Sequence, residues 1–415
     1  MKTTIKLAVA SALVAAATSA NAGIVIPAGD WTLDINGNVN AYATWTNADK
    51  VKGTAPTGGL AGTPDAAGEK NTQGINTGLL PAWLGFSGKT RQNDLDVAFT
   101  ISMQPNVSDN GAAGDANTPL NRQAFITFGD KSWGSIKLGK DIGIFAQDAI
   151  LNDMTLLGVG GAAGNSGTAT TLGGIGTGYI YAAWKGQIAY TSPNWNGFQF
   201  TAAITNPNQG FDSVNALGNG VTLNQDRFGF EGKASYAWAG DVSGKVWASA
   251  ATYDVTTLAS TATADDSYTA SAWDIGATVN VAGFGLTGYY YDGKGAGTTV
   301  FGANGAYLDA TTGTYKRRDS NGGYVQATYT IPGVGTKLGV AYGVSKLDTA
   351  SGETIADPAV AALVEKNERW TVGAYHPLTK HLNLVAEYNR IKSEGQNSAN
   401  ENESDSISAG AILFF

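Results

Sequence analysis

The side chains of this 415-residue chain that could perform chemistry are few. Its two histidines, His376 and His381, lie five residues apart beside an expected short turn, with no third ligand at metal-site spacing. The glycine-rich stretch 158–164 lacks the strand-loop-helix unit that surrounds a nucleotide-binding loop. An enzyme would need an acid-base constellation, usually including a histidine. We therefore expect no catalytic residues, no metal site and no cofactor.

The elements that must position any functional residue are strands, because apolar and polar residues alternate along many short segments. In the first segment one face carries Leu33, Ile35, Val39, Ala41 and Ala43, and the other carries Asp34, Asn36, Asn38, Asn40 and Tyr42. Side chains of a strand point alternately to opposite faces, so one face of this segment meets an apolar environment and the other meets water.

The pattern predicts sixteen strands joined by connectors that alternate between short and long. We place the strands at about 31–46, 77–90, 94–104, 121–129, 134–140, 184–192, 197–205, 227–239, 243–254, 270–281, 284–292, 322–331, 336–347, 367–376, 381–392 and 406–415. Short turns such as 240–242 and 282–283 pair neighbouring strands antiparallel, and the long polar loops then gather at the opposite rim.

The N-terminus predicts export. Lys2 and Lys6 precede an apolar run, and Ala20-Asn21-Ala22 has the small-x-small form of a cleavage site, so residues 1–22 are an expected signal peptide and 23–415 the mature domain. Cleavage removes two lysines and changes the net charge from −8 to −10, which argues against nucleic-acid binding. Beyond this signal, no apolar run approaches the roughly 18 residues of a membrane helix.

The distribution of charge decides which face is outside. Rows such as Val97-Phe99-Ile101 and Leu338-Val340-Tyr342 contain no charged residue, whereas charges fall on the opposite face. Lysine or arginine facing the bilayer midplane costs roughly 2–4 kcal/mol, so these rows fit a lipid-facing surface. The polar row then lines a lumen too wide for side chains to fill. Its charged members are Asp34, Asp94, Asp96, Arg227, Glu231, Lys233, Lys245, Asp274, Lys337, Arg369 and Glu387. We therefore expect a transmembrane antiparallel β-barrel of the bacterial outer membrane, enclosing an aqueous channel.

Several motifs resemble those of one family. The final strand, Ser406–Phe415, alternates and ends in phenylalanine, while 33–37 and 84–88 resemble the first two strands of trimeric Gram-negative general porins. The stretch 122–125 followed by 134–140 is similar to the segment that leads into the third loop of those porins. The resemblance covers essentially the whole mature chain.

The resemblance implies a homotrimer of sixteen-stranded barrels with short periplasmic turns and long extracellular loops, the third folded into the lumen. It also implies passive diffusion of small hydrophilic solutes and ions. The expected partners are like subunits, outer-membrane lipid and lipopolysaccharide, and the passing solutes. Oligomerisation also fits the first strand, where Gly37, Ala41 and Ala43 offer a smooth outer face.

The third loop, Asp141–Ala183, should narrow the channel with acids that face basic residues on the wall. Similarity suggests Asp153 as a constriction acid, with Asp148 upstream, and Arg122 as the matching wall base. Ordinary solvated loop acids are the alternative for both aspartates. Arg122 could equally neutralise an interior acid without touching solute.

The basic ladder of such porins is depleted here. Wall positions where porins often carry lysine or arginine hold Asn38 and Trp83, although Lys185 and Lys140 could restore positive charge. Trp83 could face lipid as a residue of the aromatic girdle. The apolar residues next to it are expected to face lipid, however, so we favour a lumenal position for Trp83. These departures leave the preference for cations or anions open.

Two functions besides a general pore remain to be separated. A substrate-preferring channel would use Trp83 and loop residues as a weak solute site, and saturable conductance would reveal it. A barrel enzyme such as a protease or phospholipase is disfavoured, because both histidines lie at one rim.

Overall fold

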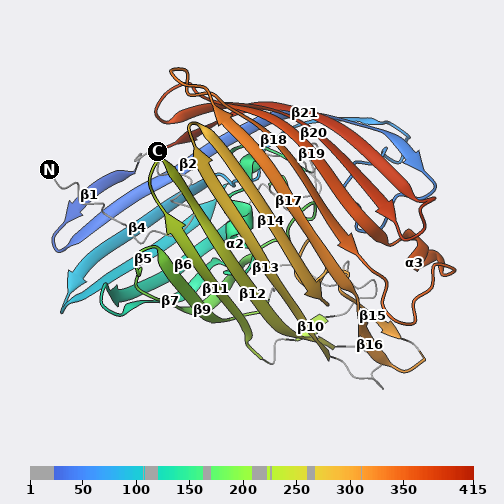
Figure 1. Cartoon of the computed structure of the whole chain (residues 1–415), viewed down its shortest axis with the longest axis horizontal. Coiled ribbons are helices and arrows are strands. Elements are labelled where there is room, and N and C mark those ends of the chain that lie inside the picture. Colours follow the sequence, from blue (N-terminus) through green and yellow to red (C-terminus); the bar gives the residue numbers. More distant parts are fainter. Residues whose placement is uncertain are drawn as a thin grey trace.

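The computed structural model describes residues 23–105, 107, 120–161, 170–207, 222–224, 227–258, 267–309 and 311–415. Residues 1–22, the expected signal peptide, lie outside these ranges. Sixteen antiparallel strands close into one barrel, which confirms the expected fold class (Figure 1). They are β2 (Trp31–Lys52), β4 (Trp83–Gln92), β5 (Leu95–Gln104), β6 (Leu120–Asp130), β7 (Gly134–Ile142), β8 (Trp184–Thr191), β9 (Phe198–Thr205), β11 (Gly229–Trp238), β12 (Val242–Leu258), β13 (Ser267–Val281), β14 (Phe284–Lys294), β17 (Asp319–Thr330), β18 (Lys337–Leu347), β19 (Val364–Pro377), β20 (Leu382–Gly395) and β21 (Glu401–Phe414).

Each barrel strand pairs with its neighbours along the chain, and the ring closes where the first strand meets the last. In β2, Ala41 lies opposite Ala411 and Ala43 opposite Ala409 of β21, while Asn38 also faces Trp83 of β4. A closed barrel leaves none of these strands with an unpaired edge. Strands within lipid must be paired on both sides, because no water is available there to hydrogen-bond the backbone.

Among the described residues, five further strands lie outside the ring of sixteen. They are β1 (Ile24–Ala28), β3 (Asn71–Asn76), β10 (Thr222–Asn224), β15 (Ala306–Asp309) and β16 (Thr314–Arg317). β1 and β3 pair with β2, and β10 pairs with β12. β1 pairs with the start of β2, where Ile24 lies opposite Ile35. The pairing of β2 with β21 follows directly after it along β2, and there the backbone of Gly37 is hydrogen-bonded to that of Phe415.

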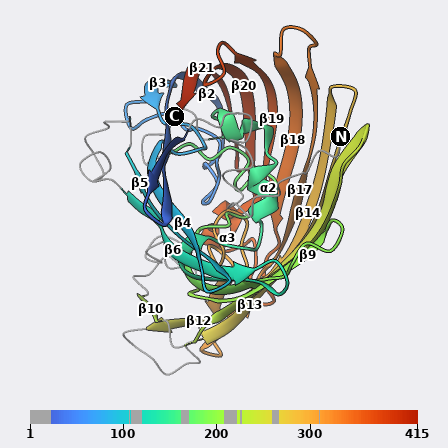
Figure 2. The same ribbon diagram turned by 90° about the vertical axis from the view of Figure 1, so that its left-hand side faces the viewer.

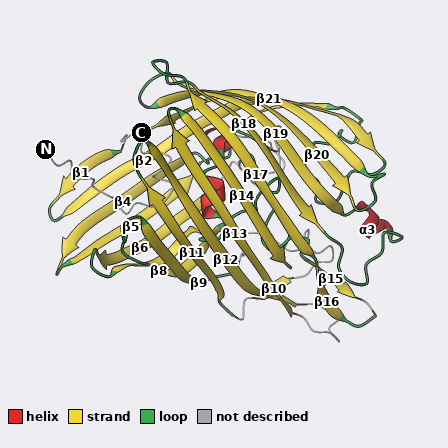
Figure 3. Cartoon of the chain, viewed as in Figure 1, coloured by secondary structure: helices red, strands yellow, loops and turns green. Residues whose placement is uncertain are grey.

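Helical structure is scarce in the described ranges (Figure 3). It comprises α2 (Gln147–Leu151), the 3₁₀ turn η1 (Met154–Leu157) and α3 (Pro358–Ala362). No helix within the described residues has the length and apolar character needed to cross a membrane.

The outer face of the ring is apolar. Side chains of adjacent strands line up across it and remain exposed, among them Val39, Ile101, Ile126, Ile188, Phe230, Ile275, Leu286, Val325, Val340, Val372, Leu384 and Ile407. The alternate residues point inward, where Tyr42, Tyr289, Tyr324 and Ile412 are buried. The core therefore lies inside the barrel, against the loop that fills part of it.

Connectors at the two rims differ in length as expected. β13 and β14 join through Ala282 and Gly283, which both adopt positive φ, the conformation that a two-residue hairpin turn requires. Between β7 and β8, by contrast, the chain makes the long excursion that forms the candidate site.

Candidate functional site

The described parts of the loop between β7 and β8, residues 143–161 and 170–183, run through the barrel interior. Figure 2 shows α2, which belongs to this loop, inside the ring of strands. Every residue from 141 to 150 is buried. The β7–β8 loop therefore occupies lumen that would otherwise hold water.

Carboxylates of the barrel wall hold the backbone of this loop. Glu231 of β11 accepts hydrogen bonds from the backbone N–H groups of Ile144 (2.5 Å) and Phe145 (3.0 Å). Asp274 of β13 accepts one from Ala146 at 3.1 Å. The three contacts fix the start of the loop, because a charged acceptor gives a stronger hydrogen bond than a neutral one.

A third carboxylate holds the far side of the loop. Glu387 of β20 accepts hydrogen bonds from Val159 (3.0 Å) and Gly160 (2.8 Å), and from the hydroxyl of Tyr375 at 2.7 Å. Gly158 lies so close to Glu387 that a Cβ at this position would stand 1.9 Å from the carboxylate. Only glycine fits this approach.

Tyrosines and an amide fix the loop between those ends. Tyr324 donates to the carbonyl of Ala149 at 2.8 Å, and Tyr42 donates to that of Leu157 at 2.6 Å. Gln326 accepts from the N–H of Met154 at 2.9 Å. Wall residues from β2, β11, β13, β17 and β20 thus engage the loop and fix its position in the lumen.

Asp148 lies in α2 and is buried between two wall lysines. Its Oδ2 is 2.8 Å from Nζ of Lys233 on β11, and its Oδ1 pairs with Lys245 on β12. Burial raises the pKa of Asp148, but the two ammonium groups outweigh it and hold that pKa below its ordinary value. The carboxyl is therefore ionised at neutral pH.

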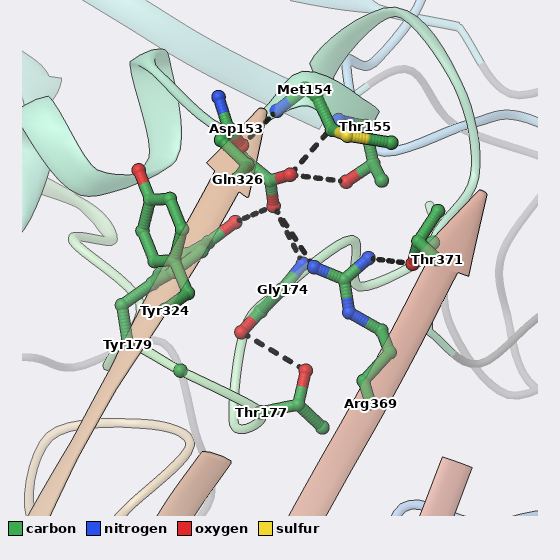
Figure 4. A network of polar contacts seen from close by, with 12 residues as sticks. Asp153, Met154, Thr155, Gly174, Thr177, Tyr179, Tyr324, Gln326, Arg369 and Thr371 are labelled. Carbon is green, nitrogen blue, oxygen red and sulfur yellow. Dashed lines mark hydrogen bonds and ion pairs between the residues drawn. The ribbon is translucent and has the colours of Figure 1, made fainter. Parts of the chain in front are cut away.

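Asp153 is buried at the centre of a second network (Figure 4). It accepts hydrogen bonds from the N–H groups of Thr155 (2.9 Å) and Gly174 (2.8 Å), and from the hydroxyl of Tyr179 at 2.8 Å. Burial, followed by the charge of Asp153, raises the pKa of Tyr179 well above its usual value, so the phenol keeps its proton and donates.

The base that faces Asp153 is Arg369 of β19, whose Nη2 lies 3.7 Å from Oδ2 of the carboxylate. Arg369 also donates to Thr371 at 2.8 Å. Similarity suggests Arg122 as the matching base, but the structure differs. Arg122 is the extra residue of a β-bulge between β5 and β6, and it interacts with the hydroxyl of Tyr181 near the end of the loop.

The two lysines expected on the wall have different positions. Lys185 of β8 is buried in the lumen, where its Nζ lies 2.6 Å from Glu231 and 2.7 Å from the hydroxyl of Tyr253. Lys140 of β7 shares the face of Ile136 and Leu138, which is the outer one. Its ammonium donates to the carbonyl of Asn121 at 2.8 Å. Strand alternation therefore removes Lys140 from the lumenal wall.

Asn38 and Trp83 lie opposite each other on the lumenal face of β2 and β4. Asn38 is fully buried and donates to the carbonyl of Pro81 at 2.9 Å. Trp83 donates to Asn36 at 3.3 Å and packs edge-on against Phe414, with ring centroids 6.4 Å apart. Asn38 thus binds the segment that joins β2 to β4, whereas Trp83 contacts β2 and β21.

Sequence reasoning did not identify the residues that anchor the loop. Alternation placed Glu231, Asp274 and Glu387 in the lumenal row, together with Lys233, Lys245 and Arg369. Their pairing with the loop could not be found, since it depends on contacts such as Lys245 to Asp148, which are 97 positions apart.

The arrangement can order water and sort solutes by size and charge, because fixed charges stand on both sides of a narrowed passage. Within the described ranges, no group of three His, Cys, Asp or Glu residues is placed to hold a metal ion. The ring of His376 is hydrogen-bonded to the hydroxyl of Thr336 at 2.9 Å. Both residues lie beside short turns, and neither contacts the β7–β8 loop through a hydrogen bond given above.

Comparison with known proteins agrees with this geometry. The outer-membrane channel DcaP of Acinetobacter baumannii superposes with a TM-score of 0.68 at 17% identity, covering 94% of this chain and 99% of that one. OmpF of Salmonella typhi, in complex with daunomycin, gives 0.59 at 17% identity, with 94% and 100% covered. OmpT of Vibrio cholerae in a trimer form gives 0.52 at 13% identity, with 93% and 99% covered. At these low sequence identities, the structural similarity shows a shared fold alone.

None of the curated protein sequences matches the chain. A family model described as Gram-negative porin, however, matches residues 8–396, nearly the whole sequence. The chain therefore belongs to the Gram-negative porins, and it forms an outer-membrane channel for passive diffusion.

Proposed function

We propose that the β7–β8 loop sets the size limit of this channel, so that small hydrophilic solutes and ions pass and larger ones are excluded. The supporting observation is the attachment of the loop to the wall through Glu231, Asp274 and Glu387. A loop held by charged acceptors on several strands narrows the lumen permanently. No bound cofactor is needed, since the solute gradient supplies the drive.

The open passage runs along the wall formed by β4–β7. Lumenal side chains there, such as Ser87 and Thr100, hydrogen-bond each other at 3.1 Å, whereas the loop's bonds go mainly to β2 and β11–β20. Lys137 of β7 stands on the same wall and pairs with Asp141. Polar side chains that are not engaged by the loop are available to passing water and solutes.

Planar-bilayer recording tests this function. Purified, heat-modifiable protein should give discrete conductance steps, and neutral polymers of increasing size should stop reducing that conductance above a sharp limit. Conductance that does not saturate with any solute fits the general channel, which the family favours over a substrate-preferring one. Folded protein without any conductance would contradict the proposal.

The channel works as a homotrimer built on the seam between β2 and β21. This is supported by the small side chains that meet on the outer face there, Ala41 opposite Ala411 and Ala43 opposite Ala409, and by the trimer form of the similar OmpT of Vibrio cholerae. Light scattering of the detergent-solubilised protein should give three times the chain mass. Substitution of Ala411 by arginine should yield monomers.

Outer-membrane lipid covers the apolar band, and lipopolysaccharide contacts the charged outer rim above it. There, Lys50 and Arg390 both pair with Glu403 at 2.5 Å, and Lys392 lies 3.1 Å from Glu401. Added lipopolysaccharide should raise the melting temperature of the purified protein.

Residues 1–22 are removed on export. The support is the Ala20-Asn21-Ala22 site and the start of β1 at Ile24, directly after it. The intact mass of protein from the outer membrane should correspond to a chain beginning at Gly23.

A further inference from the structure

The negative charges at the constriction are withdrawn from water. Glu231, Asp274 and Glu387 are buried, and their oxygens accept N–H groups of the loop or of neighbouring strands. A carboxylate with its oxygens occupied by backbone donors presents little charge to a passing ion. The carboxylates of the wall therefore hold the loop in place, and their charge is not available to attract cations.

The positive charges remain accessible. At Asp148 the carboxylate side chain is 5% exposed, whereas its partners Lys233 and Lys245 are 13% and 29% exposed. Two ammonium groups share one carboxylate, so this cluster carries one net positive charge. Lys245 lies three residues from the start of β12, at the short-turn rim.

β7, which only β8 and β9 separate from β11, repeats this asymmetry. Lys137 of β7 pairs with Asp141, and the lysine side chain is 25% exposed while the aspartate is fully buried. Gln123 also donates to Asp141 at 3.0 Å, which occupies its other oxygen. The more exposed partners of these ion pairs are therefore ammonium groups, and they lie along one arc of the wall from β7 to β12.

We propose that this porin is selective for anions, with Lys137, Lys233 and Lys245 as its selectivity residues and small carboxylates and phosphates as its preferred solutes. The inference rests on the proposed function, since only an open channel can discriminate. Lysine side chains that line a pore lower the barrier for anions and raise it for cations. The selectivity arises locally, in a chain whose overall charge is negative.

The test is the zero-current potential across a planar bilayer in a potassium chloride gradient, at low salt where charges are least screened. The wild type should be more permeable to chloride than to potassium. Lys245→Gln should lower that ratio by roughly twofold or more, because one accessible ammonium is lost while Lys233 still balances Asp148. Asp148→Asn should raise the ratio, because two lysines then stand without a counter-charge.

Controls separate charge from misfolding. Lys245→Arg should retain the wild-type ratio, and so should Lys131→Gln, which removes an exposed lysine from the turn between β6 and β7. Lys137→Gln reports on β7 and should also lower the ratio. Each variant is checked for heat-modifiable mobility before recording.

Two results would overturn the inference: a wild-type channel that favours potassium, or shifts of the same sign for Lys245→Gln and Asp148→Asn. Absence of conductance in folded wild-type protein would instead contradict the proposed function. A zero-current potential that shows succinate and phosphate to be more permeant than potassium, with a smaller preference in Lys245→Gln, would support the assignment of solute class.

Discussion

Asp148 links the stability of the constriction to pH. Its pKa in the folded protein is held below its ordinary value by Lys233 and Lys245, against about 3.9 for an unfolded aspartate. A depressed folded-state pKa contributes stability that is present above the unfolded pKa and is lost as the pH falls through the folded one. The ion-pair cluster should therefore weaken only in strong acid.

Asp148→Asn tests this linkage. The variant should melt at a lower temperature than the wild type at neutral pH, and the gap should shrink below roughly pH 4 as the wild-type carboxyl takes up its proton. Thermal unfolding of the detergent-solubilised protein, followed by circular dichroism across pH, measures the gap. A difference that stays constant down to pH 2 would exclude a charge-based contribution from this residue.

Gly158 is the residue whose substitution should disturb the constriction most directly. A Cβ there would stand 1.9 Å from Glu387, so Gly158→Ala must push the loop away from the carboxylate that accepts the N–H groups of Val159 and Gly160. Loss of those bonds costs about 1–3 kcal/mol for each buried group left unpaired. We expect a lower melting temperature and a larger polymer cut-off in conductance measurements.

Gly288→Ala is the matched control for this substitution. An added Cβ at Gly288 has no atom within 4 Å, and the residue lies on β14. The control should keep the wild-type melting temperature and cut-off. Equal effects from the two substitutions would show that the contact with Glu387 does not hold the loop.

The β7–β8 loop is held in a fixed position by hydrogen bonds from the barrel strands. Tyr42 and Tyr324 donate to its carbonyls from β2 and β17. The double variant Tyr42→Phe, Tyr324→Phe should therefore loosen the loop, at a cost of about 0.5–1.5 kcal/mol for each bond. Open-channel current noise should increase, and the melting temperature should fall. Tyr290→Phe, on the outer face, should change neither.

The sixteen barrel strands could be predicted from the sequence because alternation is a local signal. Their ends were less predictable: the strand expected at 243–254 runs from Val242 to Leu258, and the one expected at 367–376 begins at Val364. Backbone pairing in a long hairpin continues above the apolar band, where the alternation that marks a lipid-facing strand has ended. The short strands β1 and β3 gave no such signal.

The site was less accessible to sequence reasoning than the fold. Position within the third loop identified Asp148 and Asp153 as residues of interest, and alternation placed Lys233, Lys245 and Arg369 in the lumen. Which base meets which acid depends on the path of the loop, and that path follows from contacts with strands far along the chain. Arg122 was paired with Asp153 by similarity, whereas a bulge directs it to Tyr181.

The barrel wall as a whole presents an apolar outer face, and its alternate side chains point into the lumen. Neighbouring residues of β5 test this polarity directly, since Ile101 is on the exposed outer face and Thr100 is on the lumenal one, beside Ser87. Ile101→Arg should destabilise the folded barrel by roughly 2–4 kcal/mol if it lies near the bilayer midplane. Thr100→Arg should leave stability close to that of the wild type.

Urea titration of protein refolded into lipid vesicles provides the measurement for this pair of variants. Thr100→Arg should also reduce the potassium current, because it adds a positive charge on the proposed passage. If the arginine at position 100 proved the more costly of the two, the assignment of inside and outside would be reversed.

The closure of the ring has a consequence for biogenesis. β2, formed early in synthesis, finds its partner β21 only when the last residues of the chain have been made, with Asn38 opposite Phe414. A nascent polypeptide that lacks those residues keeps two bare edges, at β2 and at β20, and such edges invite aggregation. The periplasm must therefore keep the whole chain unfolded until its final strand arrives, and a truncated product should be degraded instead of being inserted as a smaller pore.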